Sequence, residues 1–493
     1  MRQREQTALI GAAGFVLDCL HWTGRRVGRS VPKASETSGH SSWWVCKEPD
    51  SLAVWGIGMS ATVARGVEPF MDEPYTGERG PESLVPVGLE DGGALSAPES
   101  PAGAGVGLNP SRETTGGRSG RWIENSPAIH TAAAEASDGM RLTSSRGRGL
   151  LIELARLREQ TERTDAWPAG AWQRVVESGL LGWGIPAEHG GHACSTREML
   201  EAYIDVSRAC LTTAFILTQR NSAVQKLVDS DRAELKERLL PPIAAGQLHV
   251  TLGISHLTTS RQHMVRPVVE ARSAGSGLVL EGEIPWVTAA PQADLIVAGA
   301  SFRDGRQVLA LVPTDARGVH VHTPGTMMAL NASQTSVVTL DGVEVPARYL
   351  LAGPVENVMR KTGGGAGSLS TSALAIGQTR YALCEMAREA ERRPDLADFV
   401  SALTEECDRL ERSLLVSATP PAFPIDAAWL RTQANSLVTR TTQSWMALAK
   451  GAGYMDQHPA AIAVRQALFF FVWSCPQPVL TAALRELTTP RGE

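Results

Sequence analysis

From about residue 148, apolar residues recur at three- and four-residue spacing, which is the pattern of amphipathic helices packed on one another. The segments that carry this pattern are LLIELARLREQTERT, AGAWQRVVESGLLGWG, the long stretch TREMLEAYIDVSRACLTTAFILTQRNSAVQKLV, and DRAELKERLLPPIAAG. Each segment has an apolar stripe that another element has to cover. The pattern therefore predicts an N-terminal helical domain over residues 148–248.

The period changes over residues 249–352, where short runs favour strands, punctuated by Gly, Asp and Asn. The runs are VTLGIS, VRPVVEARS, LVLEGEIPWVT, ADLIVAGAS, RQVLALVPT, GVHVHT and SVVTLDGVEV. Short strands separated by turn residues are typical of a compact β domain. We expect such a domain in the centre of the chain.

Helical spacing returns after the Gly/Ser-rich segment KTGGGAGSLSTS. The helical segments are ALAIGQTRYALCEMAREAERR, LADFVSALTEECDRLERSLLV, AAWLRTQANSLVTRTTQSWMALAK and AAIAVRQALFFFVW. Four such segments predict a C-terminal four-helix bundle over residues 365–487. The expected fold class is therefore α+β, in the order helical domain, β domain, helical bundle.

Residues 1–145 show neither period and are dense in Gly, Ser, Pro and Glu. A segment of this composition cannot bury enough apolar surface to offset the entropy lost on ordering. We predict a disordered, low-complexity extension, and a start further along, near Met140, stays open. The basic start followed by a short apolar run, Ala8 to Leu17, has no cleavage site of the signal-peptide type and is not interpreted as one.

Composition and charge exclude several classes of function. The net charge of −5, with 43% hydrophobic and 20% charged residues, gives no basic surface for nucleic acid. The seven cysteines are scattered without a CxxC pair, which signals neither a disulfide framework nor a zinc site and fits a cytoplasmic protein. The unbroken apolar run from Ala467 to Trp473 is far shorter than the ~20 residues that span a bilayer.

Four passages carry a resemblance to a known family. They are LLGWGIPAEHGGHACSTREMLEAYIDVSR with Pro186, Gly190 and Gly191, then GEIPWVTAAPQADLIVAGA, then LDGVEVPARYLLAG, and finally GAGYMDQHPAAIAVRQA. In this order, over about residues 148–480, they resemble motifs of the acyl-CoA dehydrogenase family of flavoproteins. Four ordered motifs are more specific than fold analogy alone.

The resemblance implies an FAD-dependent oxidoreductase that acts on the CH–CH group of an acyl-CoA-like thioester, in fatty acid metabolism. It implies an electron acceptor, such as an electron-transfer flavoprotein or a flavin reductase. The family's FAD usually crosses a subunit boundary, so a homo-oligomer is expected. Neither nucleic acid nor membrane is expected as a partner, and no metal is implied.

The resemblance also implies cofactor-binding residues. Trp286 and Thr288, with Val287 between them, match the family's W-I-T passage, in which the Trp lies against the flavin ring and the Thr hydroxyl lies near N5. Gly451 and Gly453 match glycines that admit the FAD backbone. Alternatives stay open for both: Trp286 as a core aromatic of the β domain, and KGAGY as a helix C-terminal cap.

The sequence departs from the family's pattern where the catalytic acid is expected. Ser474 stands where most members carry a glutamate. The other position used for a base falls near Gly367, within GGGAGS. Since neither position offers a carboxylate, the catalytic residue is unknown from the sequence. Ser474 and Cys475 also read as residues that end a helix before Pro476.

Two further departures concern FAD binding. In ISHLTTSRQH, where the family has T-E-P-x-x-G-S-D, Ser255, His256 and Gln262 fall around the positions that reach flavin and substrate. His256 and His263 are candidate proton carriers, or alternatively histidines of a solvent-facing loop. Arg392 matches the Arg of R-x-x-F-G, but Asp395 and Leu396 replace its Phe and Gly.

Three functions follow from these matches and departures. The first is an acyl-CoA dehydrogenase with an unusual or weakened base. The second is a flavin-dependent monooxygenase on the same fold, which needs no carboxylate and could use His256. The third is a degenerate, non-catalytic member of the family. They differ in whether flavin binds, and in whether an acyl-CoA or oxygen reacts with it.

Overall fold

A computed structural model describes residues 142, 144–259, 266–361, 369–419 and 425–489, all of which belong to one unit of the chain. The predicted low-complexity extension and the alternative start at Met140 lie outside the described residues, except for the last few residues of the extension. The α+β fold class predicted from the sequence is confirmed.

Five α-helices form the N-terminal part of the described chain. The long predicted stretch is two of them, because the chain is extended at Cys210 (φ −160°). Ser195 caps the first of the two through a capping box with Glu198. The second is buried on nearly all sides. The helices are α2 (Ser145–Glu162), α3 (Ala169–Ser178), α4 (Thr196–Ala209), α5 (Leu211–Val228) and α6 (Ala233–Ala244).

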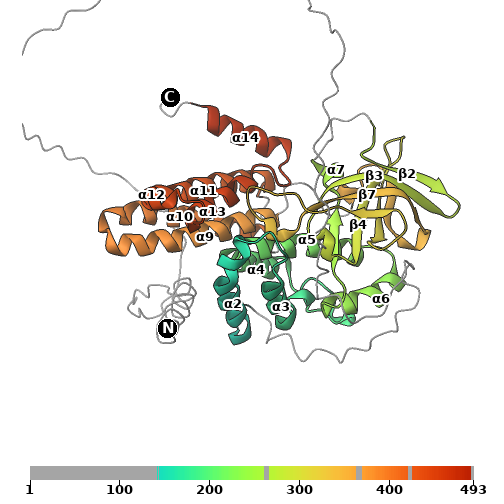
Figure 1. Ribbon diagram of the computed structural model, residues 1–493, viewed down its shortest axis with the longest axis horizontal. Helices are drawn as coiled ribbons and strands as arrows, with labels where there is room; N and C mark the ends of the chain where they lie inside the picture. Colours follow the sequence, from blue (N-terminus) through green and yellow to red (C-terminus); the bar gives the residue numbers. More distant parts are fainter. Residues whose placement is uncertain (1–141, 143, 260–265, 362–368, 420–424, 490–493) are drawn as a thin grey trace, which may run out of the picture. The chain divides into compact units, whose positions relative to one another are not determined.

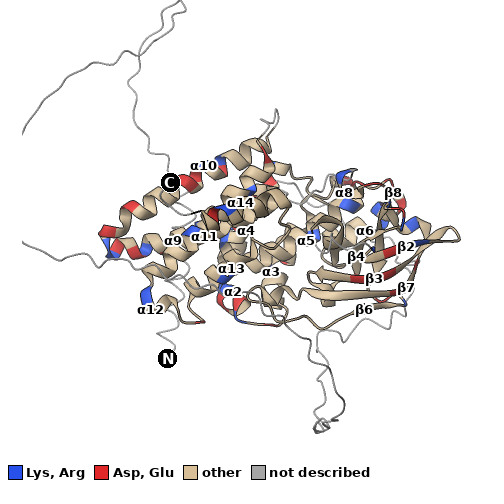
Figure 2. Cartoon of the chain, turned by 90° about the horizontal axis from the view of Figure 1, so that it is seen from above, with Lys and Arg blue, Asp and Glu red and all other residues tan. Residues whose placement is uncertain are grey.

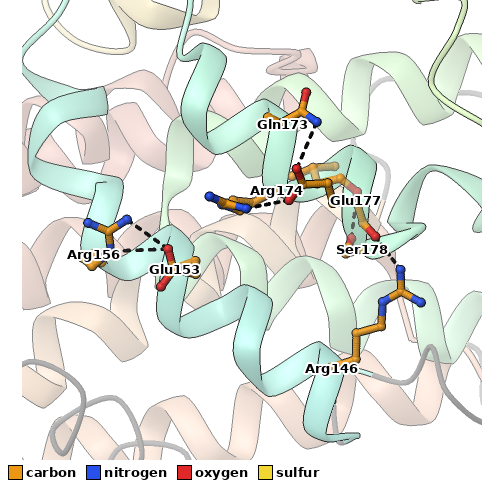
Figure 3. A network of polar contacts seen from close by, with 8 residues as sticks. Arg146, Glu153, Arg156, Gln173, Arg174, Glu177 and Ser178 are labelled. Carbon is orange, nitrogen blue, oxygen red and sulfur yellow. Dashed lines mark hydrogen bonds and ion pairs between the residues drawn. The ribbon is translucent and has the colours of Figure 1, made fainter.

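A polar network joins α2 to α3 at the surface (Figure 3). Arg146 of α2 donates to the backbone carbonyl of Glu177 at the end of α3. Gln173 and Arg174 donate to the Glu177 carboxylate at 3.0 and 2.6 Å, and these bonds hold the pKa of that carboxyl below its ordinary value. Because these groups face solvent, they orient the two helices and add little stability.

The central part is a sheet in which the strand order is β6-β7-β3-β2-β4-β5-β8, with β1 pairing in parallel with β4. Strands β4 and β5 are almost wholly buried and lie at the centre of the apolar core of the sheet. The strands are β1 (Val250–Gly253), β2 (Val269–Ala274), β3 (Gly277–Val287), β4 (Leu295–Ser301), β5 (Gln307–Pro313), β6 (Val319–Val321), β7 (Ser336–Val345) and β8 (Leu350–Val355). The short helix α7 (Ser255–Thr258) follows β1.

The C-terminal part contains the four predicted helices, α9, α10, α11 and α13, and a further helix, α14, that the sequence analysis did not single out (Figure 1). Acidic and basic residues are interspersed along α10 rather than segregated by sign (Figure 2). The helices are α8 (Val358–Lys361), α9 (Leu369–Arg392), α10 (Ala397–Ser417), α11 (Ala427–Leu448), α12 (Lys450–Gly453), α13 (Pro459–Phe469) and α14 (Gln477–Thr488).

The N-terminal helices and the C-terminal helices share one apolar core. Ser207 of α4 donates to the carbonyl of Leu374 on α9 at 2.7 Å. The two helices approach closely at Gly377, where a Cβ would lie 2.4 Å from the carbonyl oxygen of Ile204. A larger residue at this crossing would force α4 and α9 apart.

No helix among the described residues has both the length and the hydrophobicity that crossing a membrane requires. In the same part of the chain, no three His, Cys, Asp or Glu side chains are grouped so as to hold a metal ion.

We predict that Gly377→Ala lowers the free energy of unfolding by about 1–3 kcal/mol, because the added methyl group meets the α4 backbone. Gly149→Ala on α2 is the matched control, since a Cβ there has no neighbour within 4 Å. That control should be neutral or stabilise the protein by up to about 1 kcal/mol. Urea denaturation of both variants measures the difference. Equal shifts in the two variants would contradict the close crossing.

Candidate functional site

A cavity of about 740 Å³ lies where the three parts of the chain meet. Its walls come from α5, α7, the ends of β1 and β3, the start of α9 and the end of α13, segments far apart in the sequence (Figure 1). This volume is in the range of cavities that hold small molecules and cofactors. We treat it as the candidate active site.

Of the residues predicted to bind the cofactor or to stand at the catalytic position, four line this cavity: Trp286, Thr288, Ser255 and Ser474. Trp286, near the end of β3, is 57% exposed, so it is not a core aromatic of the β domain. Val287 does not line the cavity. Its side chain is fully buried in the core of the sheet, because successive residues of a strand point to opposite faces.

Thr288 is held rigidly at the cavity wall. Thr335 donates to its hydroxyl at 3.3 Å, and Thr251 donates to its carbonyl at 2.7 Å. Thr288 is buried, and within the described residues its hydroxyl donates no hydrogen bond. Thr288 therefore presents a fixed donor to whatever fills the cavity.

Ser255 and His256, neighbours on α7, differ in their surroundings. The Oγ of Ser255 is buried and has no hydrogen-bond partner among the described residues, although the residue lines the cavity. The imidazole of His256 is buried off the cavity, and its Nε2 lies 2.9 Å from the carbonyl of Gly299. His256 is thus neither a solvent-facing histidine nor a cavity-lining one. Gln262 and His263 lie outside the described residues.

The chain turns at Ser474 to reach the cavity. Helix α13 ends at Phe469, and Ser474 adopts a left-handed conformation with φ +45°. The helix therefore ends before Ser474, so Ser474 and Cys475 are not the residues that end it. Ser474 lies in the turn that follows and lines the cavity. The alternative base position, Gly367, lies outside the described residues.

Arg431 of α11 fixes this turn from behind. Its Nη2 donates to the carbonyls of Phe470 and Trp473 at 3.1 and 3.0 Å, and Asn435 also donates to the Phe470 carbonyl, at 2.9 Å. Arg431 is fully buried, and burial lowers its pKa to about 9. The sequence analysis missed this residue, because its signal is only one Arg among the polar positions of a helix.

None of the described residues that line the cavity is Asp or Glu. The charged side chains there are Lys226 and Arg465. Arg465 pairs with Asp456 at 3.1 Å, and burial lowers the pKa of Lys226. The charged side chains of the described wall are therefore both basic, and the missing acid predicted from Ser474 is not replaced by a carboxylate in the described wall.

A second cavity, of about 540 Å³, is lined by the ends of α9 and α11 and the start of α13. Arg392 and Lys450 lie on its wall, in a set of four cations and two glutamates. Beside it, Gly451 has open space at its Cα, whereas a Cβ on Gly453 would lie 2.7 Å from the carbonyl of Met446. Gly453 is thus required for packing at the helix end, while Gly451 exposes its backbone.

Comparison with known proteins gives one family. The model of the acyl-CoA dehydrogenase N-terminal domain matches residues 151–247. The chain is 26% identical over 337 residues to the probable acyl-CoA dehydrogenase YngJ of Bacillus subtilis, covering 64% of this chain and 88% of that protein. It is 24% identical over 330 residues to the short-chain specific mitochondrial acyl-CoA dehydrogenase of Bos taurus, covering 62% of this chain and 79% of that protein.

Solved structures show the same fold. A glutaryl-coenzyme A dehydrogenase in its glutaryl-CoA complex matches with a TM-score of 0.61 at 18% identity, over 71% of this chain and 96% of that chain. Butyryl-CoA dehydrogenase from Megasphaera elsdenii matches with a TM-score of 0.61 at 16% identity, over 70% of this chain and 99% of that chain.

We predict that Arg431→Ala lowers the free energy of unfolding by about 2–4 kcal/mol, because it leaves buried carbonyls with fewer donors and opens a void. Arg392→Ala is the control, since its side chain is 79% exposed and should shift stability by no more than about 0.5 kcal/mol. Thermal and urea unfolding of both variants provide the test. If Arg431→Ala left the free energy of unfolding unchanged, the turn at Ser474 would be held by other contacts.

Proposed function

The chain belongs to the acyl-CoA dehydrogenase family, and on that premise we propose that it is an FAD-dependent oxidoreductase acting on the CH–CH group of an acyl-CoA-like thioester. One observation carries the proposal. Trp286, Thr288, Ser255 and Ser474 come from segments far apart in the sequence and line the same cavity.

The residues present fit a flavin ring. The exposed indole of Trp286 offers a flat apolar surface to a planar ring. The hydroxyl of Thr288 and the unpartnered Oγ of Ser255 supply polar groups that a flavin's ring atoms and side chain can satisfy. FAD, when bound, accepts the hydride that leaves the β-carbon of the substrate.

The second cavity fits an anionic group of the same cofactor. Its four cations, Arg392 and Lys450 among them, outnumber the two glutamates that pair with three of them, and this excess of positive charge favours a pyrophosphate. The open backbone at Gly451 allows close approach. The two predicted parts of the FAD site lie in separate cavities of the chain. We therefore propose a homo-oligomer in which the Arg392 cavity of one copy completes the flavin site of another.

We propose an electron-transfer flavoprotein as the electron acceptor. In the monooxygenase alternative a flavin reductase would instead supply electrons to the flavin, and oxygen would accept them. We place the protein in the cytoplasm, because its cysteines form no sequence pattern typical of a secreted disulfide framework. The monooxygenase alternative loses the support of His256, whose ring faces Gly299 rather than the cavity. It is kept as an outcome of the tests below.

Because the described cavity wall has no carboxylate, we expect the proposed reaction to be slow. A side chain that removes the α-proton contributes about 10²–10⁴-fold to such a rate. The hydroxyl of Ser474 is a poor base at neutral pH, and Arg465 on the same wall offers only hydrogen-bond donors and already pairs with Asp456. The binding determinants of the site are thus better supported than its proton acceptor.

We predict that the protein binds FAD and that Trp286→Ala weakens this binding at least about tenfold, because the ring loses its stacking surface. The measurement is the visible spectrum of the purified protein, followed by titration of the apoprotein with FAD and identification of the released chromophore. Trp429→Ala is the control, since that exposed indole is not among the residues of the cavity. A colourless protein that takes up no FAD would support the non-catalytic alternative.

We further predict that Ser474→Glu raises acyl-CoA dehydrogenation, by up to about 10²-fold, because it restores a carboxylate at the cavity wall. The exchange keeps a non-glycine residue in the left-handed conformation that Ser474 already adopts, so it adds little backbone strain. Anaerobic bleaching of the flavin by acyl-CoA thioesters measures the rate, with Ser474→Gln as the uncharged control. An unchanged rate in a variant that still holds flavin would refute this role.

A further inference from the structure

One face of α5 forms a long wall of the candidate active site. Its cavity-lining residues follow at three- and four-residue spacing and therefore lie on one side of the helix. They are Phe215, Thr218, Gln219, Ser222, Gln225 and Lys226. With a rise of 1.5 Å per residue this face extends for about 16 Å, long enough to run beside an acyl chain. After Phe215, every side chain on it is polar.

The polar side chains of this face differ in whether their hydrogen bonds are already made. Thr218 donates back to the Phe215 carbonyl at 2.7 Å, and Gln225 donates to Asp229 at 2.7 Å. Neither the amide of Gln219 nor the hydroxyl of Ser222 has a hydrogen bond within the described residues, and both are half-buried. They present donors and acceptors to the cavity.

The opposite end of the cavity differs in chemistry. Phe215 packs against Phe469 and Trp473, with ring centroids 4.9 and 5.0 Å apart, and Leu468 and Val472 continue this apolar surface. An apolar acyl chain would be matched at that end and by apolar side chains that other segments contribute to the wall, such as Leu252, Ile254 and Met359. Along the rest of α5 it would remove water from the amide and the hydroxyl without replacing their hydrogen bonds, which is unfavourable.

The charged side chains of the wall also favour a hydrophilic ligand over an apolar one. Lys226 is buried at the far end of this face, and the described lining contains Arg465 as a second cation and no carboxylate. In a site of low effective dielectric, such a wall attracts electron-rich groups of a ligand. Asp229, which caps the C-terminal end of α5, accepts from Gln225 and also attracts the charge of Lys226 from outside the cavity lining.

We propose that this face of α5 selects a thioester whose acyl group is hydrophilic, bearing hydroxyl, amide or carboxylate groups, over one with a saturated hydrocarbon chain. The inference rests on the proposed function, because it names the substrate class of the same cavity. A site that hydrogen-bonds a substrate group discriminates strongly against analogues that lack it, whereas a purely apolar pocket discriminates weakly.

The test is calorimetric titration of the FAD-loaded protein, kept anaerobic, with three thioesters of equal chain length: hexanoyl-CoA, ω-hydroxyhexanoyl-CoA and adipoyl-CoA. We expect the two hydrophilic thioesters to bind at least about tenfold more tightly than hexanoyl-CoA. The double variant Gln219→Met with Ser222→Ala should lose the preference for the hydroxyl group. Lys226→Met should lose only the preference for the carboxylate. Gln443→Met, on an exposed part of α11 away from the cavity, is the control.

Three outcomes are distinguishable. Hydrophilic preference in the parent protein that disappears in the α5 variants, with the Gln443 control unchanged, supports the inference. Preferred binding of hexanoyl-CoA, or a hydrophilic preference that the α5 variants keep, overturns the inference and leaves the proposed function standing. If none of the three thioesters binds to protein that holds FAD, the proposed function fails and the inference fails with it.

Discussion

The burial of α5 on nearly all sides is the constraint on which the rest of the structure depends. A helix in that position must satisfy its polar side chains internally or present them to a ligand. Thr212 donates to Glu162 of α2 at 2.9 Å, and Arg220 donates to the Ile243 carbonyl at the end of α6 at 2.8 Å. These bonds lock α5 to its neighbours. Gln219 and Ser222 have no such bonds within the described residues, and they face the cavity.

The end of α13 is fixed by the same kind of buried polar contact. Gln466 donates to Glu162 at 2.5 Å and accepts from Gln378 of α9 at 2.8 Å, and burial raises the pKa of Glu162. Arg465 and Phe469, on either side of Gln466 in the same helix, line the cavity. The carboxylate of Glu162 therefore joins α2, α5 and α13, so the two facing walls of the cavity are held at a set distance by one group behind them.

Periodicity and turn residues predicted most of the helices and strands, because each type of element has to bury its own stripe or face, but they did not predict α14. The convergence of Trp286, Thr288 and Ser474 came from motif resemblance, since no local pattern reveals contacts between distant segments. Alternation along β3 would have excluded Val287 from the cavity. The polar face of α5 was not predicted, because helices were recognised by the spacing of their apolar residues and the spacing of polar residues on a buried helix was not considered. Arg431 could not be predicted, because its partners are backbone carbonyls that any sequence supplies.

Under the proposed function, the site divides its tasks between two walls with different physical requirements. A wall that positions a flavin needs fixed hydroxyls and a flat ring, and these come from β3 and α7, which the sheet holds rigidly. A wall that selects a substrate needs only a pattern of side chains on a helix, and α5 can change that pattern without changing its packing. The lack of a carboxylate at Ser474 belongs to neither requirement, because it concerns proton transfer and changes no side chain of either wall. Cofactor binding, substrate selection and catalysis can thus diverge separately on this fold.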